Sequence, residues 1–168
     1  MAAKIIRPII VDGQVAFVPL TQGLVATIDA SDLHLVEGRN WCATRMGNIV
    51  YGVTKINRAS VLLHAAIMGK RPGFQVDHID GDGLNNRRSN LRFASKAQNQ
   101  WNRAIPSNNK SGIKGASWCS TNKKWRAAIT VSGKYIGLGY FQSPEEAGEA
   151  YKVAALKHHG EYFCSREM

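Results

Sequence analysis

A carboxylate, an imidazole and two side-chain amides stand in order within residues 75–102. Asp77 and His78 are adjacent at the end of an apolar run, Asn90 follows a stretch rich in Gly, Asp and Asn, and Asn99 comes nine residues later. Carboxylate and amide oxygens are ligands of hard divalent cations, which favours Mg²⁺ or Mn²⁺ over Zn²⁺. A neutral histidine accepts a proton near pH 7. A cation and a base are what phosphodiester hydrolysis requires.

The sequence around these residues predicts a strand, a loop, a second strand and a helix. Residues 73–78 form an apolar entry, and residues 81–86 contain Gly, Asp and Asn, which tolerate positive φ at a turn. Residues 91–94 alternate apolar and polar side chains, as a short strand does. Residues 95–98 read Ser-Lys-Ala-Gln, a capping box, so a helix that carries Asn99 begins there.

A plainer interpretation of the same residues is also open. Asp77 and Asp80 would then cap a turn, and His78 would be a surface residue. Adjacent strand residues point to opposite faces, so Asp77 and His78 share one site only if the strand is twisted or ends there. The loop, the capping box and Asn99 together favour the chemical interpretation.

The order of these residues resembles the HNH homing endonucleases, a phage and bacterial family with a ββα-metal fold. The matching residues are Asp77, His78, Asn90 and Asn99, and the homing members commonly show Asn at the last position. The resemblance implies that Asp77 and Asn99 hold one divalent cation, with Mg²⁺ favoured and Mn²⁺ the alternative. It also implies that His78 is the general base and that Asn90 belongs to the catalytic set.

The formal net charge is +10, and its placement is informative. Residues 84–143 contain no Asp or Glu. Such a basic stretch suits a polyanion, here double-stranded DNA, although a generally basic soluble protein is the alternative. Arg87, Arg88 and Arg92 lie inside the nuclease-like motif and are predicted to bind DNA. The other basic residues of the stretch are Lys96, Arg103, Lys110, Lys114, Lys123, Lys124, Arg126 and Lys134.

Length and composition suit one large domain or two small ones, since the chain has 168 residues of which 44% are hydrophobic. The sequence has neither an apolar run of roughly 18 residues, as a membrane span needs, nor a signal-peptide pattern. We therefore expect a soluble protein without a membrane partner, in the cytoplasm of a bacterial or phage-infected cell. Cys42, Cys119 and Cys164 are far apart and odd in number, which favours reduced thiols over a zinc site or a disulfide framework.

Residues 1–57 predict short strands and contain no evident active site. One hairpin turns at Asp12-Gly13, a strand covers 25–28, and a second hairpin turns at 46–48. Residues 29–32 are expected to cap a short helix that runs through Leu33, Leu35 and Val36 and ends near Gly38.

Residues 58–69 predict a helix with an apolar stripe that ends at Gly69 and packs behind the nuclease-like motif. His64 on this helix is expected to be a packed, hydrogen-bonded residue rather than a catalytic one.

A second domain is predicted after a linker. Residues 103–112 are polar and rich in turn-forming residues, which indicates the linker. Three strands and a helix follow within residues 113–168. The helix has Ser143 as its cap, Pro144 at its first position and Glu146 at its third.

The second domain resembles the plant ethylene-response-factor (APETALA-type) DNA-binding domain. The motifs that carry the resemblance are Gly115-Ala-Ser-Trp, Lys124-Trp-Arg-Ala, Leu138-Gly-Tyr-Phe and Glu145-Glu-Ala. It implies a three-stranded sheet in the major groove with a helix behind it. The implied DNA contacts are Lys114, Ser117, Trp118, Lys124, Arg126, Thr130 and Lys134. Plant members carry Arg or Trp at several positions that hold Ser117, Tyr135 and Gly137 here, so a different recognition sequence is expected.

These features predict an α+β protein in which a ββα-metal (HNH) nuclease module precedes a three-stranded antiparallel sheet packed on one helix. Residues 1–102 form the catalytic module, with its core at 58–102, and residues 103–112 link it to the DNA-binding domain at 113–168. The predicted function is metal-dependent endonucleolytic hydrolysis of duplex DNA by a monomer, at a site selected partly by the second domain. The alternatives are a transcription-factor-like binder with an inactive nuclease motif and a non-catalytic protein that coats nucleic acid.

Overall fold

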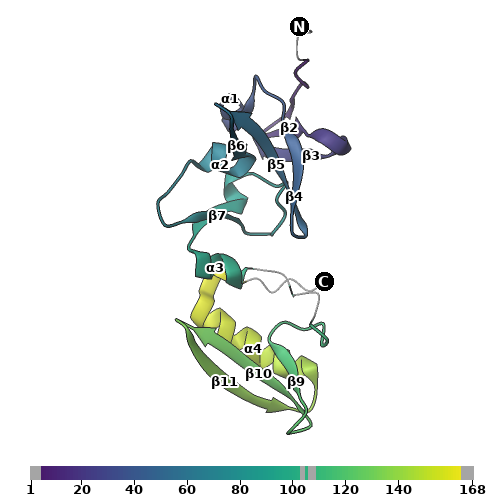
Figure 1. Ribbon diagram of the computed structural model, residues 1–168, viewed down its shortest axis with the longest axis vertical. Coiled ribbons are helices and arrows are strands. Elements are labelled where there is room, and N and C mark those ends of the chain that lie inside the picture. Colours follow the sequence, from purple (N-terminus) through teal and green to yellow (C-terminus); the bar gives the residue numbers. More distant parts are fainter. Residues whose placement is uncertain (1–4, 103–104, 106–108, 164–168) are drawn as a thin grey trace. The chain divides into compact units, whose positions relative to one another are not determined.

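The amino-terminal part of the chain folds into short antiparallel strands because apolar residues alternate with polar ones between turn sequences. The computed structural model describes residues 5–102, 105 and 109–163. The chain divides into two units, Met1–Lys96 and Ala97–Met168, whose elements are labelled in Figure 1.

Three small antiparallel sheets build the first unit. The first contains β1 (Ile10–Asp12), β2 (Val15–Pro19) and β3 (Val25–Asp29); the second contains β4 (Cys42–Met46), β5 (Ile49–Ile56) and β6 (Ala59–Leu62); the third pairs β7 (Gln75–His78) with β8 (Leu91–Ala94). The helical segments are η1 (Thr21–Gly23), η2 (Ala30–Asp32), α1 (Leu33–Val36), α2 (Leu63–Met68) and η3 (Arg88–Asn90). Both predicted hairpins, the strand at 25–28 and the helix at 33–36 are confirmed.

The helix predicted over residues 58–69 is half wrong. Ala59–Leu62 form the edge strand β6, which pairs with β5, and the helix α2 covers only Leu63–Met68. The reason lies in the preceding turn, where Asn57 and Arg58 both have positive φ, at 50° and 67°. Two consecutive residues in this conformation make a tight hairpin turn, which directs the chain back along β5. The apolar residues that predicted one helix therefore belong to a strand, β6, and to a shorter helix, α2.

The core of the first unit forms where β2 and β3 pack with α1, α2 and β8. Its fully buried members are listed here: Ala16, Val18, Leu20, Ala26, Ile28, Val36, Trp41, Leu63, Ile67 and Leu91. Trp41 donates its indole N–H to the carbonyl of Val36 at 2.9 Å, which satisfies its one polar atom. Gly52 lets β5 approach α2, because a Cβ there would lie 3.2 Å from the Cβ of Leu63.

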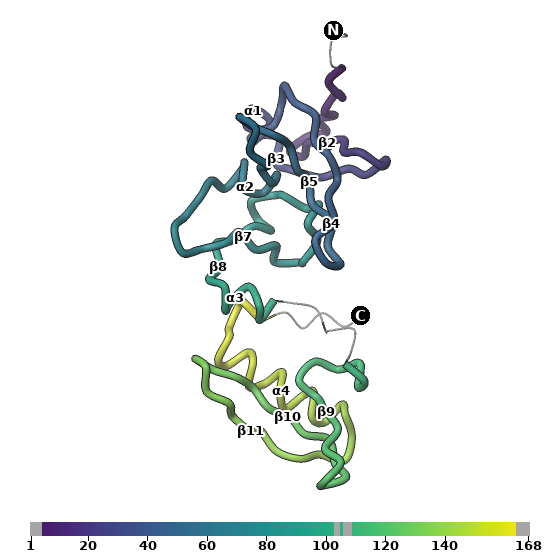
Figure 2. Tube along the Cα trace, viewed as in Figure 1, coloured from purple at the N-terminus to yellow at the C-terminus, as the bar shows by residue number. Residues whose placement is uncertain are grey.

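The second unit contains a three-stranded sheet with one long helix. The strands β9 (Ala116–Cys119), β10 (Lys124–Val131) and β11 (Lys134–Phe141) are antiparallel, with β10 in the middle. The helix α4 (Pro144–His159) runs along this sheet, as Figure 2 shows, and η4 (Gly160–Tyr162) follows it. The predicted capping box is confirmed, since Ser143 Oγ accepts from the backbone N–H of Glu146 at 3.1 Å.

Small residues let α4 approach the sheet closely. The centre of this core is Ala116, Ala127 and Ala147, with larger apolar side chains around them. Gly115 has a φ of 83° and lies against the ring of Tyr151, where any side chain would collide.

The short helix α3 (Lys96–Trp101) lies mostly within the second unit. The Trp101 ring stacks on His159 of α4 with centroids 4.0 Å apart and planes at 6°. Lys114 donates its ammonium to the carbonyl of Trp101 at 2.8 Å. The linker predicted at 103–112 falls partly outside the described residues, and the predicted domain limits stay predictions.

In the part of the chain that the structure describes, no helix is long and apolar enough to cross a membrane. Cys42 and Cys119 are free thiols, and Cys164 lies outside the described residues.

Candidate active site and nucleic-acid interface

The candidate site begins at the last two residues of β7. Asp77 and His78 are both buried, at 5% exposure each. Asp77 lies opposite Arg92 of β8, whose Nε donates to the Asp77 carboxylate at 2.9 Å. The strand ends at His78, whose carbonyl accepts from the N–H of Gly81 at 2.9 Å as the chain turns. The strand therefore ends at His78, but Asp77 and His78 both still pair with β8, and the site that they would share stays a prediction.

His78 lies in a cluster of three rings. Its ring centroid is 5.0 Å from that of His64 on α2 and 5.7 Å from that of Tyr51 on β5. Tyr51 and His64 meet edge to face at 5.6 Å. Figure 1 shows these three elements within the first unit. The prediction that His64 is a packed residue is confirmed by its 9% exposure.

Burial sets the protonation of this cluster. It lowers the pKa of His64 to about 4, with a smaller contribution from His78. Burial also lowers the pKa of His78, although the hydrogen bond with Asn86 and the charges of nearby aspartates oppose the change. The pKa of Tyr51 is raised by burial and then by the charge of Asp77. Both imidazoles are therefore neutral at pH 7, and His78 is able to accept a proton.

Asn90 holds the loop between β7 and β8 in place. Its Oδ1 accepts from the backbone N–H of Asp80 at 3.0 Å, while its Nδ2 donates to the carboxylate of Asp80 and the carbonyl of Asn85, both at 2.8 Å. Burial would raise the pKa of Asp80, but the hydrogen bonds from Asp82, Asn90 and Asn85 outweigh burial and lower it. The structure thus gives Asn90 a clear task in shaping the loop; its catalytic role stays a prediction.

The loop also packs against β5 and pairs with β3. A Cβ on Gly83 would lie 2.7 Å from the ring of Tyr51 and would collide with the carbonyl of Val50. Thr27 of β3 donates its N–H to Leu84 at 2.8 Å and accepts from the N–H of Asn86 at 2.7 Å. Only a glycine permits this approach to β5, so position 83 fixes the loop beside Tyr51.

The arginines of the loop are engaged in ion pairs. Arg87 Nε lies 3.0 Å from the carboxylate of Asp29, and Arg88 contacts both carboxylate oxygens of Asp32 through Nε at 2.9 and 3.1 Å. These hydrogen bonds raise the pKa of Arg88. The sequence analysis missed Asp29 and Asp32 as partners because they lie more than fifty residues away along the chain. Binding of Arg87, Arg88 and Arg92 to DNA stays a prediction.

Asn99, the second ligand implied by the resemblance, lies on α3 and belongs to the second unit. The residues that the structure describes contain no group of three or more His, Cys, Asp or Glu that could hold a metal ion. Of the two predicted metal ligands, Asp77 and Asn99, only Asp77 is one of these four residue types. Its carboxylate oxygens are suitable donors for a hard divalent cation.

In the second unit, the face of the sheet opposite α4 is exposed. Along β10, Ala127 and Ile129 are buried against the helix side, so alternation places Arg126 and Thr130 on the outer face. The register puts Arg126 between Ser117 of β9 and Tyr140 of β11.

Two tyrosines lie on this outer face. Tyr140 is 50% exposed beside Arg126, and Tyr135, which pairs with Thr130, is 62% exposed. The sequence analysis did not include either in the candidate site. The alternation of side chains along β11 could have indicated these tyrosines, but only the pairing of β11 with β10 shows that they lie on the same face as Arg126. Lys124 also lies on this face, because it is two residues before Arg126.

Three other predicted contacts lie elsewhere. Trp118 pairs with Trp125 on the helix side of the sheet, with ring centroids 5.4 Å apart. Lys134 pairs with Val131, also on that side. Lys114 uses its ammonium to bind Trp101, as described above. The register therefore does not bring these three onto the outer face, and their contact with DNA stays a prediction.

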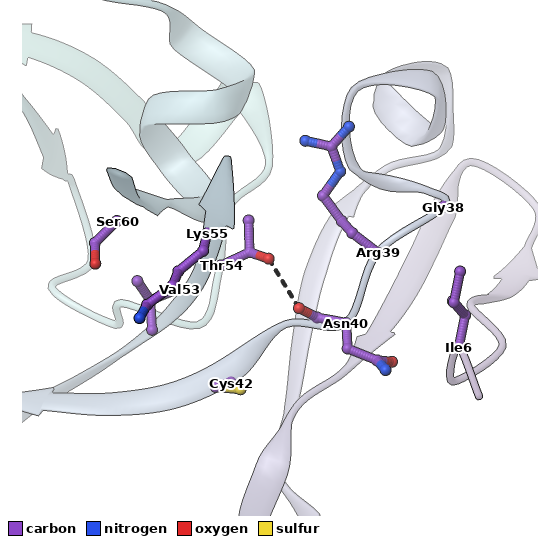
Figure 3. A pocket seen from close by; sticks show the side chains of 9 residues that line it. All are labelled: Ile6, Gly38, Arg39, Asn40, Cys42, Val53, Thr54, Lys55 and Ser60. Carbon is purple, nitrogen blue, oxygen red and sulfur yellow. Dashed lines mark hydrogen bonds between the residues drawn. The ribbon is translucent and has the colours of Figure 1, made fainter. Parts of the chain in front are cut away.

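A separate cavity of about 450 Å³ lies in the first unit (Figure 3). Thr54 donates its hydroxyl to the carbonyl of Asn40 at 2.9 Å in its wall. Figure 3 shows Arg39 and Lys55 extending away from each other, so the two cations do not converge on one ligand. None of the lining residues belongs to the ring cluster around His78.

Comparison with known proteins identifies the family of the segment that contains these residues. Residues 59–101, which carry His64, the two strands and Asn99, match the family model described as HNH endonuclease. The chain therefore contains an HNH endonuclease domain, as the sequence predicted. No solved structure matches the chain.

Two viral relatives extend the comparison. The chain is 41% identical over 81 residues to Protein 3.8 of Escherichia phage T7, a match that covers 48% of this chain and 67% of that protein. It is 29% identical over 163 residues to Uncharacterized HNH endonuclease L560 of Acanthamoeba polyphaga mimivirus, which covers 95% of this chain and 84% of that protein. The chain thus belongs to the same family as the phage T7 protein. The homing type and the ethylene-response-factor resemblance stay predictions.

Proposed function

We propose that the chain is a divalent-metal-dependent DNA endonuclease of the HNH homing type that acts as a monomer in the cytoplasm of a bacterial or phage-infected cell. The observation that carries this proposal is a buried carboxylate, Asp77, next to a buried and neutral imidazole, His78, inside the segment that matches the HNH endonucleases. A DNA-binding protein without catalysis has no need for a base held neutral beside a carboxylate.

Each residue of the site has a separate task. His78 takes the proton from the attacking water, since burial keeps its imidazole unprotonated at working pH. Asp77, oriented by Arg92, is the oxygen ligand for Mg²⁺ or Mn²⁺, and Asn99 is the second ligand that the resemblance implies. When bound, the cation neutralises charge that develops on the phosphate.

The second unit selects the DNA site by laying its outer sheet face on the duplex. The distribution of charge on the two sides of the sheet supports this. The cations Lys124 and Arg126 lie on the outer face, whereas the carboxylates Glu145, Glu146 and Glu149 lie on α4, which packs on the other face. A two- or three-stranded ribbon fits a major groove about 12 Å wide.

Incubation of the full chain with supercoiled plasmid tests the function. We expect nicked circles with Mg²⁺ or Mn²⁺, no cleavage in EDTA, and loss of cleavage with retained DNA affinity in Asp77→Ala. His78→Ala should lower the rate by about 10²–10⁴-fold. Cleavage in EDTA at the full rate would contradict the proposal, and binding without cleavage under any of these conditions would favour the inactive DNA binder.

A further inference from the structure

Asn86 is a fully buried amide whose atoms all have partners. Its exposure is 0%, and its Nδ2 donates to the carbonyls of Gly83 at 3.3 Å and Leu84 at 3.0 Å. Its Oδ1 lies 3.3 Å from Nε2 of His78. The backbone N–H of Asn86 is fixed as well, because it donates to the carbonyl of Thr27 on β3 at 2.7 Å.

These partners determine which way the amide points. The carbonyls of Gly83 and Leu84 only accept hydrogen bonds, so the side of Asn86 that faces them must be the NH₂ group. The oxygen is thereby directed at His78. A reversed amide would place two acceptors against each other in a site without water contact, which costs free energy.

The direction of the amide in turn determines the tautomer of His78. An amide oxygen only accepts, so Nε2 of a neutral His78 must carry the hydrogen and Nδ1 must carry the lone pair. The surrounding rings of His64 and Tyr51 restrict rotation of the imidazole that would exchange the two nitrogens.

We propose that Asn86 is a positioning residue that selects the Nε2–H tautomer of His78 and so makes Nδ1 the proton acceptor of the nuclease reaction. This inference rests on the proposed role of His78 as the base. The two asparagines of the loop have different tasks. The side chain of Asn90 hydrogen-bonds Asp80 and the carbonyl of Asn85, whereas the amide oxygen of Asn86 lies next to the imidazole of His78.

Nitrogen NMR of the full chain, labelled with ¹⁵N-histidine, tests the tautomer directly and needs no activity. At a pH above about 7, we expect the neutral His78 ring to be protonated at Nε2 in the wild type. Asn86→Asp keeps an acceptor oxygen toward His78 and should keep this tautomer, but its second oxygen faces the carbonyls of Gly83 and Leu84, so the variant should be less stable than the wild type. Asn86→Leu removes the acceptor at similar volume, so both tautomers of the His78 ring should be populated, and the single-turnover cleavage rate should fall by about tenfold or more with DNA affinity unchanged.

Asn85→Ala is the matched control. It removes a hydrogen bond of the same loop, from Asn85 Nδ2 to Asp80 at 2.7 Å, without touching His78, and it should leave the Nε2–H tautomer in place. A wild-type His78 protonated at Nδ1 would overturn the proposal, as would a folded Asn86→Leu with the wild-type tautomer and rate. If Asn86→Leu does not fold, the wild-type and Asn86→Asp spectra still decide. A chain with the expected tautomer that never cuts DNA would refute the proposed function and leave the role of Asn86 in orienting His78 intact.

Discussion

The two neighbouring imidazoles of the site are kept neutral by the same physical cause. His64 and His78 lie 5.0 Å apart inside the first unit, where burial penalises a charge on either ring. The proposed role of His78 as a base requires this neutrality, since a protonated imidazole cannot take a proton from water. His64 has the larger effect on folding because its pKa moves furthest.

Stability should therefore depend on pH between about 4 and 6.5. The unfolded chain binds a proton at His64 below its ordinary pKa of 6.5, while the folded chain binds it only near pH 4. The stabilisation is complete above pH 6.5 and is lost as the pH falls, by about 2 kcal/mol between pH 7 and pH 5. Urea unfolding at both pH values should show this loss, and His64→Phe should reduce it, with the remaining slope due to His78 and His159, whose pKa values burial also lowers.

His34→Ala provides the control, because His34 is an exposed residue hydrogen-bonded to the carbonyl of Ser31. The slope of His64→Phe is compared with the slopes of this variant and of the wild type. Equal slopes in His64→Phe and the wild type would contradict the assignment.

Among the elements of the first unit, the loop between β7 and β8 positions the residues of the candidate site. It is fastened at three points: to β5 through Gly83, to β3 through Thr27, and to itself through Asn90. None of these contacts involves a metal or DNA. The shape of the loop depends on contacts within the chain itself, above all on close packing beside Tyr51.

Gly83→Ala should disturb this packing. The added methyl group must displace the carbonyl of Val50 or the ring of Tyr51, so we expect a loss of about 1–3 kcal/mol in unfolding free energy and a lower cleavage rate. Gly137→Ala is the comparison, since a Cβ at Gly137 meets no atom within 4 Å. Thermal unfolding of both variants measures the difference, and equal stability would show that the loop accommodates the methyl group.

Elements with a local cause could be predicted from the sequence. The hairpins, the strands that carry Asp77 and the cap of α4 each depend on residues within a few positions of one another. β6 could not be predicted, because the turn at Asn57 and Arg58 uses residue types that do not require positive φ. Asn86 was also missed, because its buried partner His78 is defined by the shape of the loop and not by spacing.

Across the whole molecule, positive charge counted in the sequence differs from charge that is available to DNA. Arg87 and Arg88 of the first unit each have an aspartate partner, whereas Arg126 of the second unit has no ion-pair partner in the part of the chain that the structure describes. Affinity for DNA should therefore depend strongly on the sheet of the second unit.

Arg126→Ala should weaken binding of the full chain to a labelled mixed-sequence duplex, measured by fluorescence anisotropy in EDTA. The logarithm of the affinity should also fall less steeply with the logarithm of the salt concentration, by about one unit of slope for each lost phosphate contact. Lys157→Ala removes an exposed charge from α4, away from the sheet face, and should change neither. Equal effects of the two variants would show that net charge, and not the sheet face, determines binding.

The pairing of Arg87 with Asp29 and of Arg88 with Asp32 has a consequence for exchanging parts between nucleases. A transplanted loop of residues 79–90 would bring two arginines into a host without their aspartates, and it would also lose the backbone pairing with Thr27. The smallest segment that carries its own counter-charges begins at β3 and ends at β8. This loop could therefore be transferred to another protein only together with the preceding segment from β3 onward.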